Sequence, residues 1–322
     1  FYGYDKIEPT VFKGEAALGG YLPKQKFERE INEVCRGLGY YEVMTYSFGS
    51  RTAWDRIHLP GDSPLHRAFV IQNPLGEDTS VMRTTALPSM LDVLGTNFAK
   101  RNMDVKLFEL AMIYLPVEGR ELADEQTILT LGAYGREAGF FELKGSIETL
   151  LANLRIKNVR FEAVSDNSAY HPGRCAKILH GDTVLGILGQ THPSVAEEFG
   201  LTVSVYTAEI SVSALMSSVS PEPTYVPLPR FPAMTRDIAV VCDSSVTVAA
   251  LSDTMYAAGG DYLENCKLFD VYIGAGIPEG KRSVAFSLTM RAKDQTLTDD
   301  HADEILKSIL LKLEKVHGAV IR

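Results

Sequence analysis

The chain has 322 residues, of which 45% are hydrophobic and 23% are charged, a balance typical of a globular protein. This length exceeds that of one ordinary hydrophobic core, so we expect two domains. The net charge of -9 argues against a generic nucleic-acid binder, because neutralising phosphates normally takes a basic surplus.

Targeting signals and paired cysteines are both missing from the sequence pattern. No run approaches the ~20 apolar residues of a membrane-spanning helix, and the N-terminus does not read as a secretory signal. The four cysteines are far apart and form no Cys-x-x-Cys pair: Cys35, Cys175, Cys242 and Cys266. We therefore predict isolated packing thiols in a cytoplasmic protein without membrane association. Because the chain starts at Phe1 and not at methionine, we also expect a truncated or processed chain.

The first part of the chain carries the pattern of an α+β domain. Phe27, Ile31 and Val34 recur at helical spacing after Pro23, and Gly39 is expected to end that helix. A second helix is predicted to begin near Leu87, where the following proline suits the first turn, and a third covers 143–154. Strands are predicted over 40–48, 106–114, 171–178, 186–193 and 205–210.

Five prolines between positions 221 and 232 prevent a helix or a central strand from forming there. We predict a linker at this point. The expected organisation is a remnant of a preceding domain over 1–20, a large domain over 21–217, a linker over 218–229 and a final domain over 230–322.

The final domain alternates strands and helices in the order β-α-β-β-α-β. Strands are predicted over 236–243, 266–273, 282–290 and 319–322, with a helix over 247–258. Thr298 is expected to cap the second helix and Gly318 to end it. The buried stripe of that helix is predicted to be Ala302, Ile305, Ile309, Leu313 and Val316. This order is that of the split ferredoxin-like arrangement, with helices on one sheet face and the other face open.

Four motifs of this domain point to a known family: P-x-x-x-R-D-I-A around Arg236, L-F-D-V-Y over 268–272, G-I-P-E-G-K-R-S over 276–283 and T-L-T-D-D over 296–300. They resemble the ferredoxin-fold anticodon-binding domain that closes phenylalanyl-tRNA synthetase β chains. The last five residues are also similar to that family's C-terminus, so we expect the true end at Arg322. The resemblance implies tRNA contacts from Arg230, Arg236, Tyr272, Lys281, Arg282, Arg291 and Lys293.

The large domain carries G-L-G-Y-Y-E-V-M-T-Y-S-F, N-P-L-G-E-D-T-S-V-M-R-T-T-A-L-P and Y-H-P-G-R in this order. These motifs resemble the catalytic-like domain of the same β chains, a noncatalytic relative of the class II synthetase fold. The implied fold class is α+β, a class II synthetase-like antiparallel-sheet domain followed by a ferredoxin-like βαββαβ domain. The match is weakest over 118–136 and 159–168, where we expect variable loops.

A working class II site needs arginines and a glycine-rich strand, because adenylate formation requires stabilisation of a charged phosphorus centre. At the corresponding positions the chain has Glu209 and Ser211 in place of glycines and Ala214 in place of an arginine. An acidic group without an arginine opposes ATP binding. Arg83 and Glu109 echo catalytic-subunit residues, but for Arg83 we expect a structural ion pair or a helix-cap contact, and we assign catalysis to neither residue.

His171 and His192 each precede a proline, and the histidines and cysteines lack the spacing of a metal site, so we expect turn and core roles and no metal ligands. The resemblance implies no catalytic residue and no cofactor in this fragment, with ATP and Mg²⁺ used by the complete enzyme. Its implied partners are the α subunit, in a complex of two α and two β chains, and the tRNA for phenylalanine. An apolar face of the large domain is expected to contact the α subunit.

Two other hypotheses remain open from the sequence. A stand-alone RNA- or protein-binding module could reuse a dead synthetase fold, and editing modules encoded upstream of Phe1 would eliminate that hypothesis. A free-standing adenylate-forming enzyme would exchange pyrophosphate into ATP in the presence of an amino acid.

Overall fold

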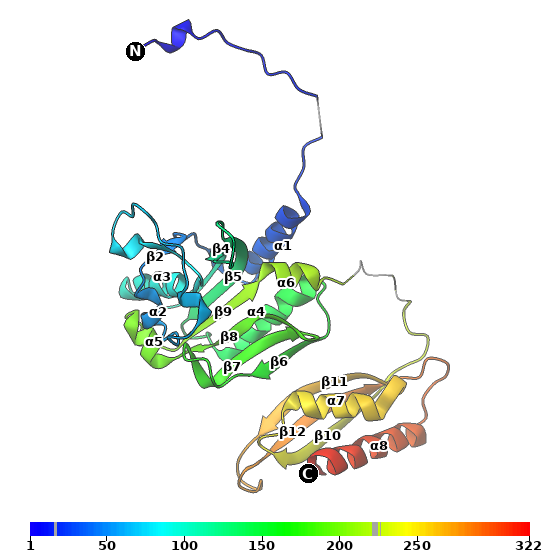
Figure 1. The fold of residues 1–322 in the computed structure, drawn as a ribbon. Coiled ribbons are helices and arrows are strands. Elements are labelled where there is room, and N and C mark those ends of the chain that lie inside the picture. Colours follow the sequence, from blue (N-terminus) through cyan, green and yellow to red (C-terminus); the bar gives the residue numbers. More distant parts are fainter. Residues whose placement is uncertain (16–17, 221–224, 226) are drawn as a thin grey trace. The chain divides into compact units, whose positions relative to one another are not determined.

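The computed structural model describes residues 1–15, 18–220, 225 and 227–322, and it divides into two compact units, Phe1–Pro223 and Thr224–Arg322 (Figure 1). Residues 221–224 and 226 of the predicted linker lie outside the described residues.

A seven-stranded sheet forms the centre of the larger unit, in the order β1-β4-β5-β9-β8-β7-β6. Its strands are β1 (Tyr41–Glu42), β4 (Val105–Leu115), β5 (Asp124–Tyr134), β6 (Val159–Ala163), β7 (Tyr170–His180), β8 (Thr183–Thr191) and β9 (Val205–Ser211). Only the pairing of β1 with β4 is parallel, and the other neighbours are antiparallel. The predicted mostly antiparallel α+β architecture is confirmed.

Helices cover both faces of this sheet. They are α1 (Pro23–Gly37), α2 (Ala53–Arg56), α3 (Leu87–Ala99), α4 (Phe140–Asn153), α5 (Pro193–Glu198) and α6 (Val212–Ser217). The helices α1, α4 and α6 pack on one face, over a core that includes Phe108 and Ile210. The helices α3 and α5 pack on the opposite face, where Met90 and Leu94 of α3 approach Gly132. Alternate residues of each strand therefore belong to two different cores.

The strand predicted over 40–48 is wrong in its extent. Only β1 and the short β2 (Phe48–Gly49), which pairs with β3 (Val81–Met82), are formed in that segment. After β1, the Val43 N–H still bonds to a backbone acceptor of β4, the Phe108 carbonyl. Two residues later, the Thr45 N–H bonds instead to the Glu109 side chain. The backbone hydrogen bonds between β1 and β4 therefore stop here, because a side chain supplies the acceptor.

The loops predicted over 118–136 and 159–168 are also wrong, because β5 and β6 form there. Strand β5 lies in the middle of the sheet, and its residues 127–134 are all buried. A strand covered on both faces reads as a continuous run without alternation, which weakens its sequence signal.

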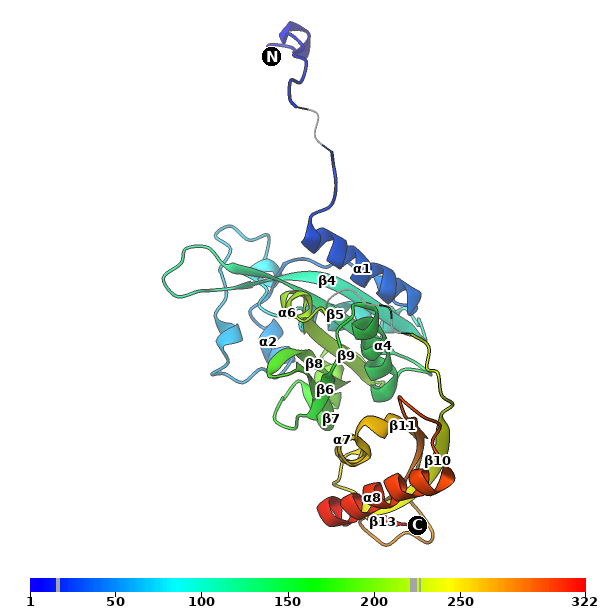
Figure 2. The same cartoon turned by 90° about the vertical axis from the view of Figure 1, so that its right-hand side faces the viewer.

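The smaller unit contains a four-stranded sheet in the order β11-β12-β10-β13. Its elements are β10 (Met234–Asp243), α7 (Val248–Gly259), β11 (Leu263–Tyr272), β12 (Lys281–Met290), α8 (Asp299–His317) and β13 (Val320–Ile321). Both helices lie on one side of the sheet (Figure 2), over a core that includes Val284, Phe286 and Leu288. The predicted ferredoxin-like order is confirmed.

The ends of α8 follow the sequence signals. Thr298 Oγ1 accepts a hydrogen bond from the His301 N–H at 3.4 Å, and Gly318 adopts a left-handed conformation with φ of 59°. Four members of the predicted stripe are buried, but Val316 is 51% exposed, so its assignment to the core is wrong. The core contact ends one turn before the helix does.

Candidate functional site

A buried ion pair joins three elements at the β1 edge of the larger unit. Arg83 and Glu109 are 3.2 Å apart, with side chains 7% and 5% exposed. Arg83 also donates to the Met112 carbonyl at 2.8 Å and to Thr45 Oγ1 at 2.6 Å. Thr45 in turn donates its N–H and hydroxyl to the Glu109 carboxylate. The ion pair expected for Arg83 is present, and its structural role stays a prediction supported by these internal contacts.

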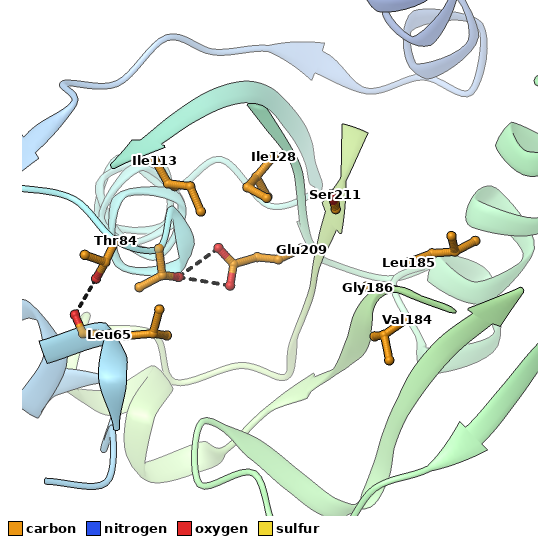
Figure 3. Close-up of a pocket in the computed structure, with 10 residues that line it drawn as sticks. Leu65, Thr84, Ile113, Ile128, Val184, Leu185, Gly186, Glu209 and Ser211 are labelled. Carbon is orange, nitrogen blue, oxygen red and sulfur yellow. Dashed lines mark hydrogen bonds between the residues drawn. The ribbon is translucent and has the colours of Figure 1, made fainter. Parts of the chain in front are cut away.

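A second carboxylate, Glu209 on β9, lies at the start of α3 beside a cavity (Figure 3). One oxygen, Oε1, accepts hydrogen bonds from Thr85 Oγ1 at 2.8 Å, the Ala86 N–H at 2.8 Å and the Leu87 N–H at 3.1 Å. The other, Oε2, accepts from Thr85 Oγ1 at 3.0 Å. The side chain therefore occupies the free N–H groups of a helix N-terminus, which otherwise suit an anionic ligand.

Burial raises the pKa of the Glu209 carboxyl above its ordinary value, and the hydrogen bonds from Thr85, Ala86 and Leu87 oppose that shift. Ser211, two residues further along β9, lines the same cavity and caps α6, where its hydroxyl accepts from the Ala214 N–H at 3.2 Å. The positions expected to hold glycines and an arginine thus hold a fixed carboxylate, a helix cap and a helical alanine. This arrangement repels a polyphosphate.

The histidines and cysteines noted in the sequence form local hydrogen bonds or remain free thiols. His192 caps α5 and His171 accepts the Gly173 N–H at 3.1 Å, which agrees with the expected turn role, whereas neither histidine is buried in a core. The cysteines are free thiols, three buried and Cys266 half-buried. Within residues 1–15, 18–220, 225 and 227–322, no group of three His, Cys, Asp or Glu side chains is arranged to hold a metal ion.

The seven residues predicted to contact tRNA lie at two ends of the smaller sheet. Tyr272 ends β11 and pairs with Ser283, next to Lys281 and Arg282 at the start of β12. The other four lie near the opposite end of β10 and β12: Arg230, Arg236, Arg291 and Lys293. Strand β10 has 10 residues, so these ends are about 30 Å apart at ~3.3 Å per residue. The fold does not bring the seven residues together.

Three residues of the second group have acidic partners. Arg236 pairs with Asp299 at 2.6 Å and with Asp303 at 3.6 Å, and the hydrogen bond to Asp299 raises the pKa of the guanidinium. Arg291 pairs with Glu264 at 2.7 Å and also donates to the Phe231 carbonyl. Lys293 lies 3.4 Å from Asp261, with both side chains largely exposed. These contacts favour structural roles, and the predicted tRNA contacts of this group stay predictions.

Strand pairing separates the residues of the first group onto two faces. Side chains alternate along β12, and Val284, Phe286 and Leu288 point to the helices. Arg282 lies two positions before Val284, so its side chain is on the same face as the helices, and it donates to the Val246 carbonyl at 2.6 Å beside α7. Lys281 lies one position before Arg282 and therefore on the open face. Tyr272 is on this face too, because it pairs with Ser283, two positions after Lys281.

Arg322 joins this end of the open face, and the sequence argument did not identify it as a contact residue. Its N–H bonds to the Ala239 carbonyl next to β13, and its guanidinium lies 5.1 Å from the centre of the Tyr272 ring. The Tyr272 hydroxyl donates to the Ala275 carbonyl at 3.3 Å. A side chain at Gly274 would lie 2.9 Å from that hydroxyl, so the turn closes tightly over the ring. Strand alternation extended past β13 is the signal that would have placed Arg322 on this face.

Small side chains lie between the basic and aromatic groups of the open face. Ser283 and Ala285 of β12 pair with Val241 and Ala239 of β10, and none of the four is long or charged. Ser283, Ala285 and Val241 are only 3%, 8% and 9% exposed, so the longer side chains around them form the accessible surface of this face. Among the described helices, none is long and apolar enough to cross a membrane.

Comparisons with known proteins match both units. The model of the phenylalanyl tRNA synthetase beta chain CLM domain matches residues 7–212, and the model of the ferredoxin-fold anticodon binding domain matches residues 229–322. The phenylalanine–tRNA ligase beta subunits of Clostridium acetobutylicum and Symbiobacterium thermophilum are each 38% identical to this chain. The matches cover 100% and 99% of this chain, but only 40% and 37% of those proteins.

A solved structure supports the fold of the larger unit. The pyrrolysyl-tRNA synthetase of Desulfitobacterium hafniense matches with a TM-score of 0.51 at 15% identity, over 60% of this chain and 68% of that one. At this identity the likeness concerns the fold alone. Since one family model covers more than half of the sequence and a second covers the smaller unit, the chain belongs to the phenylalanyl-tRNA synthetase beta-chain family.

Proposed function

We propose that this chain is the noncatalytic C-terminal part of the β subunit of phenylalanine–tRNA ligase, the enzyme that attaches phenylalanine to its tRNA with ATP and Mg²⁺. The complete enzyme is proposed to be cytoplasmic and to contain two α and two β chains. The two family models and the names of the relatives support this function. The stand-alone alternative is not favoured, because both units match models of this family and the relatives that match nearly the whole chain are named beta subunits.

The α subunit is proposed to cover the β1 edge of the larger unit. Along that edge Tyr41, Met44 and Tyr46 are 76%, 90% and 74% exposed, and Tyr46 stacks on Phe48 with ring centres 4.9 Å apart. Large apolar side chains gathered at a sheet edge favour contact with another protein. The buried pair formed by Arg83 and Glu109 lies directly behind this edge and fixes Thr45 between the exposed residues.

This interface can be tested by placing a charge in it. Met44→Glu is expected to weaken assembly with the α subunit, measured as the share of heteromeric complex in analytical ultracentrifugation. Leu311→Glu is the matched control, because Leu311 is 66% exposed on α8 of the smaller unit. Full assembly of the Met44 variant, or equal loss in both variants, would argue against this edge as the interface.

The smaller unit is proposed to bind the tRNA at the end of its open face that carries Tyr272, Lys281 and Arg322. The observation that carries this proposal is the guanidinium of Arg322 over the Tyr272 ring, with no acidic partner for Arg322 among the described residues. Proteins recognise unpaired RNA bases by stacking them on aromatic rings or guanidinium planes. Lys281 is exposed next to this pair and can contact a phosphate.

A binding experiment with the intact enzyme tests this surface. Tyr272→Ala is expected to weaken tRNA binding by about 5-fold to 150-fold, the range that follows from ~1–3 kcal/mol for one stacked base. Lys281→Ala is expected to reduce the dependence of log Kd on log salt concentration by about 0.7, the value for one phosphate contact on a single strand. Lys312→Ala, an exposed lysine of α8 on the helix side of the sheet, is the control and should bind tRNA like the unchanged enzyme. Unchanged binding in the first two variants would refute this location.

A further inference from the structure

The cavity beside Glu209 has no part in the function proposed above. Its volume is about 280 Å³, at the small end of ligand sites. Aliphatic side chains from several separate elements form most of its wall, namely Leu65, Ile113, Ile128, Val184 and Leu185 (Figure 3). The contents of such a cavity must be small and mainly apolar.

Glu209 is the one charged side chain that lines this cavity, and its two oxygens are unequally bonded. Oε1 accepts from the Ala86 and Leu87 N–H groups, and the single Thr85 hydroxyl hydrogen is shared between Oε1 at 2.8 Å and Oε2 at 3.0 Å. A carboxylate oxygen can accept two or more hydrogen bonds. Oε2 therefore keeps acceptor capacity, and part of the Glu209 side chain remains exposed.

The remaining polar groups of the cavity are already engaged. Thr84 Oγ1 accepts from the Trp54 indole at 3.1 Å and donates to the Leu65 carbonyl at 2.6 Å. The Ser211 hydroxyl lies 3.0 Å from that of Ser213 and caps α6. A ligand can therefore form its strongest polar contact with Glu209.

The carboxylate also has no counter-ion in the part of the chain that the structure describes. Arg83 is the basic residue that acts on it electrostatically, yet the Arg83 guanidinium is bonded to Glu109, Thr45 and the Met112 carbonyl. Backbone N–H groups stabilise the charge of Glu209 without neutralising it. A cationic group would gain both the ionic attraction and the free acceptor of Oε2.

We propose that this cavity binds a small apolar molecule that carries a primary ammonium group. The ammonium donates to Glu209 Oε2, and the apolar part is removed from water by the wall around Ile113 and Val184. Anions are repelled by the fixed carboxylate, and a neutral alcohol of the same shape gains only an uncharged hydrogen bond. The inference does not depend on the tRNA surface, which lies in the other unit.

The test uses the intact enzyme and three probes of one shape: cyclohexylmethylamine, cyclohexylmethanol and cyclohexanecarboxylate. Binding is measured by ligand-observed NMR at constant ionic strength near neutral pH. The amine is expected to bind with Kd of about 1 mM, as is usual for a ligand of eight non-hydrogen atoms. The alcohol is expected to bind about 10-fold more weakly, because it replaces a charge-assisted hydrogen bond to Glu209 with an uncharged one. The carboxylate is expected not to bind.

Three variants assign the binding to this cavity. Glu209→Gln should remove the preference of the amine over the alcohol and leave the alcohol unchanged. Val184→Trp should fill the mouth and abolish the binding of both probes, because Val184 is 51% exposed there. Val203→Trp is the matched control, an exposed valine outside the cavity, and should bind like the unchanged protein.

The same experiment can overturn the proposal. Absence of amine binding at concentrations far above about 1 mM would do so. Amine binding that survives both Glu209→Gln and Val184→Trp would also do so, because it would come from elsewhere in the enzyme. Equal affinity of the amine and the carboxylate in the unchanged protein would exclude recognition by Glu209.

Discussion

Removing the Glu109 carboxylate should destabilise the larger unit strongly. In Glu109→Ala the Arg83 guanidinium stays in a site where its side chain is 7% exposed, without the partner at 3.2 Å. The Thr45 N–H and hydroxyl lose their acceptor as well. Breaking a buried pair from one side costs about 3–5 kcal/mol, because an uncompensated charge remains inside the protein. The free energy of unfolding should fall by that amount.

Trp54 gives a direct assay, because it is the only tryptophan of the chain and is 6% exposed in the larger unit. Its fluorescence during urea unfolding therefore reports on this unit alone. With a urea slope of ~2–3 kcal/mol per molar, the midpoint of Glu109→Ala should fall by about 1–2 M. The double variant Arg83→Met, Glu109→Leu should lose less, since it leaves no buried charge.

A loss below about 1 kcal/mol in Glu109→Ala would refute the structural role of this pair, because it would mean that the buried guanidinium needs no partner. A catalytic role makes a different prediction. It would lower adenylate formation per folded enzyme molecule, whereas the structural role leaves that rate unchanged. Measuring both quantities on the same preparation separates the two.

Three further predictions concern Glu209 and Tyr272. This chain without the α subunit should exchange no pyrophosphate into ATP in the presence of phenylalanine, and detectable exchange would contradict the noncatalytic role. Because burial raises the pKa of Glu209, the folded state holds its proton more tightly than the unfolded state. Stability should therefore fall as the pH rises through and above the ordinary value of 4.5, and a pH series of Trp54 unfolding curves should lose this component in Glu209→Gln. Gly274→Val should displace the Tyr272 ring, whose hydroxyl lies 2.9 Å from the added Cβ, and should weaken tRNA binding while far-ultraviolet circular dichroism stays unchanged.

Local sequence patterns were sufficient for several elements in which one face is buried and the other is polar. The helix α1, the strand β12 and the capped ends of α8 follow directly from spacing, from Thr298 and from Gly318. The same patterns failed for β5, because a strand that is covered on both faces shows no alternation. They failed again over 43–47, where the Thr45 N–H bonds to a side chain 64 residues away.

For the candidate sites, the sequence located individual residues but not the contacts between distant segments. Sequence by itself placed an acidic residue, Glu209, where a nucleotide site needs glycine, and it placed Tyr272 and Lys281 in one strand-turn-strand segment. It could not pair Glu209 with the N–H of Ala86, which is 123 residues away. It also did not find that Arg322 covers the Tyr272 ring.

The physical reason is the range over which each property acts. Helical spacing, caps and turn residues act within a few positions, so the sequence determined the order of the elements in the smaller unit. Strand register acts between segments far apart in the chain, and a shift by one residue would move every side chain to the other face. Only the tertiary structure therefore decided that Glu209 faces α3, that Arg282 and Lys281 lie on opposite faces, and that the basic residues separate into two groups.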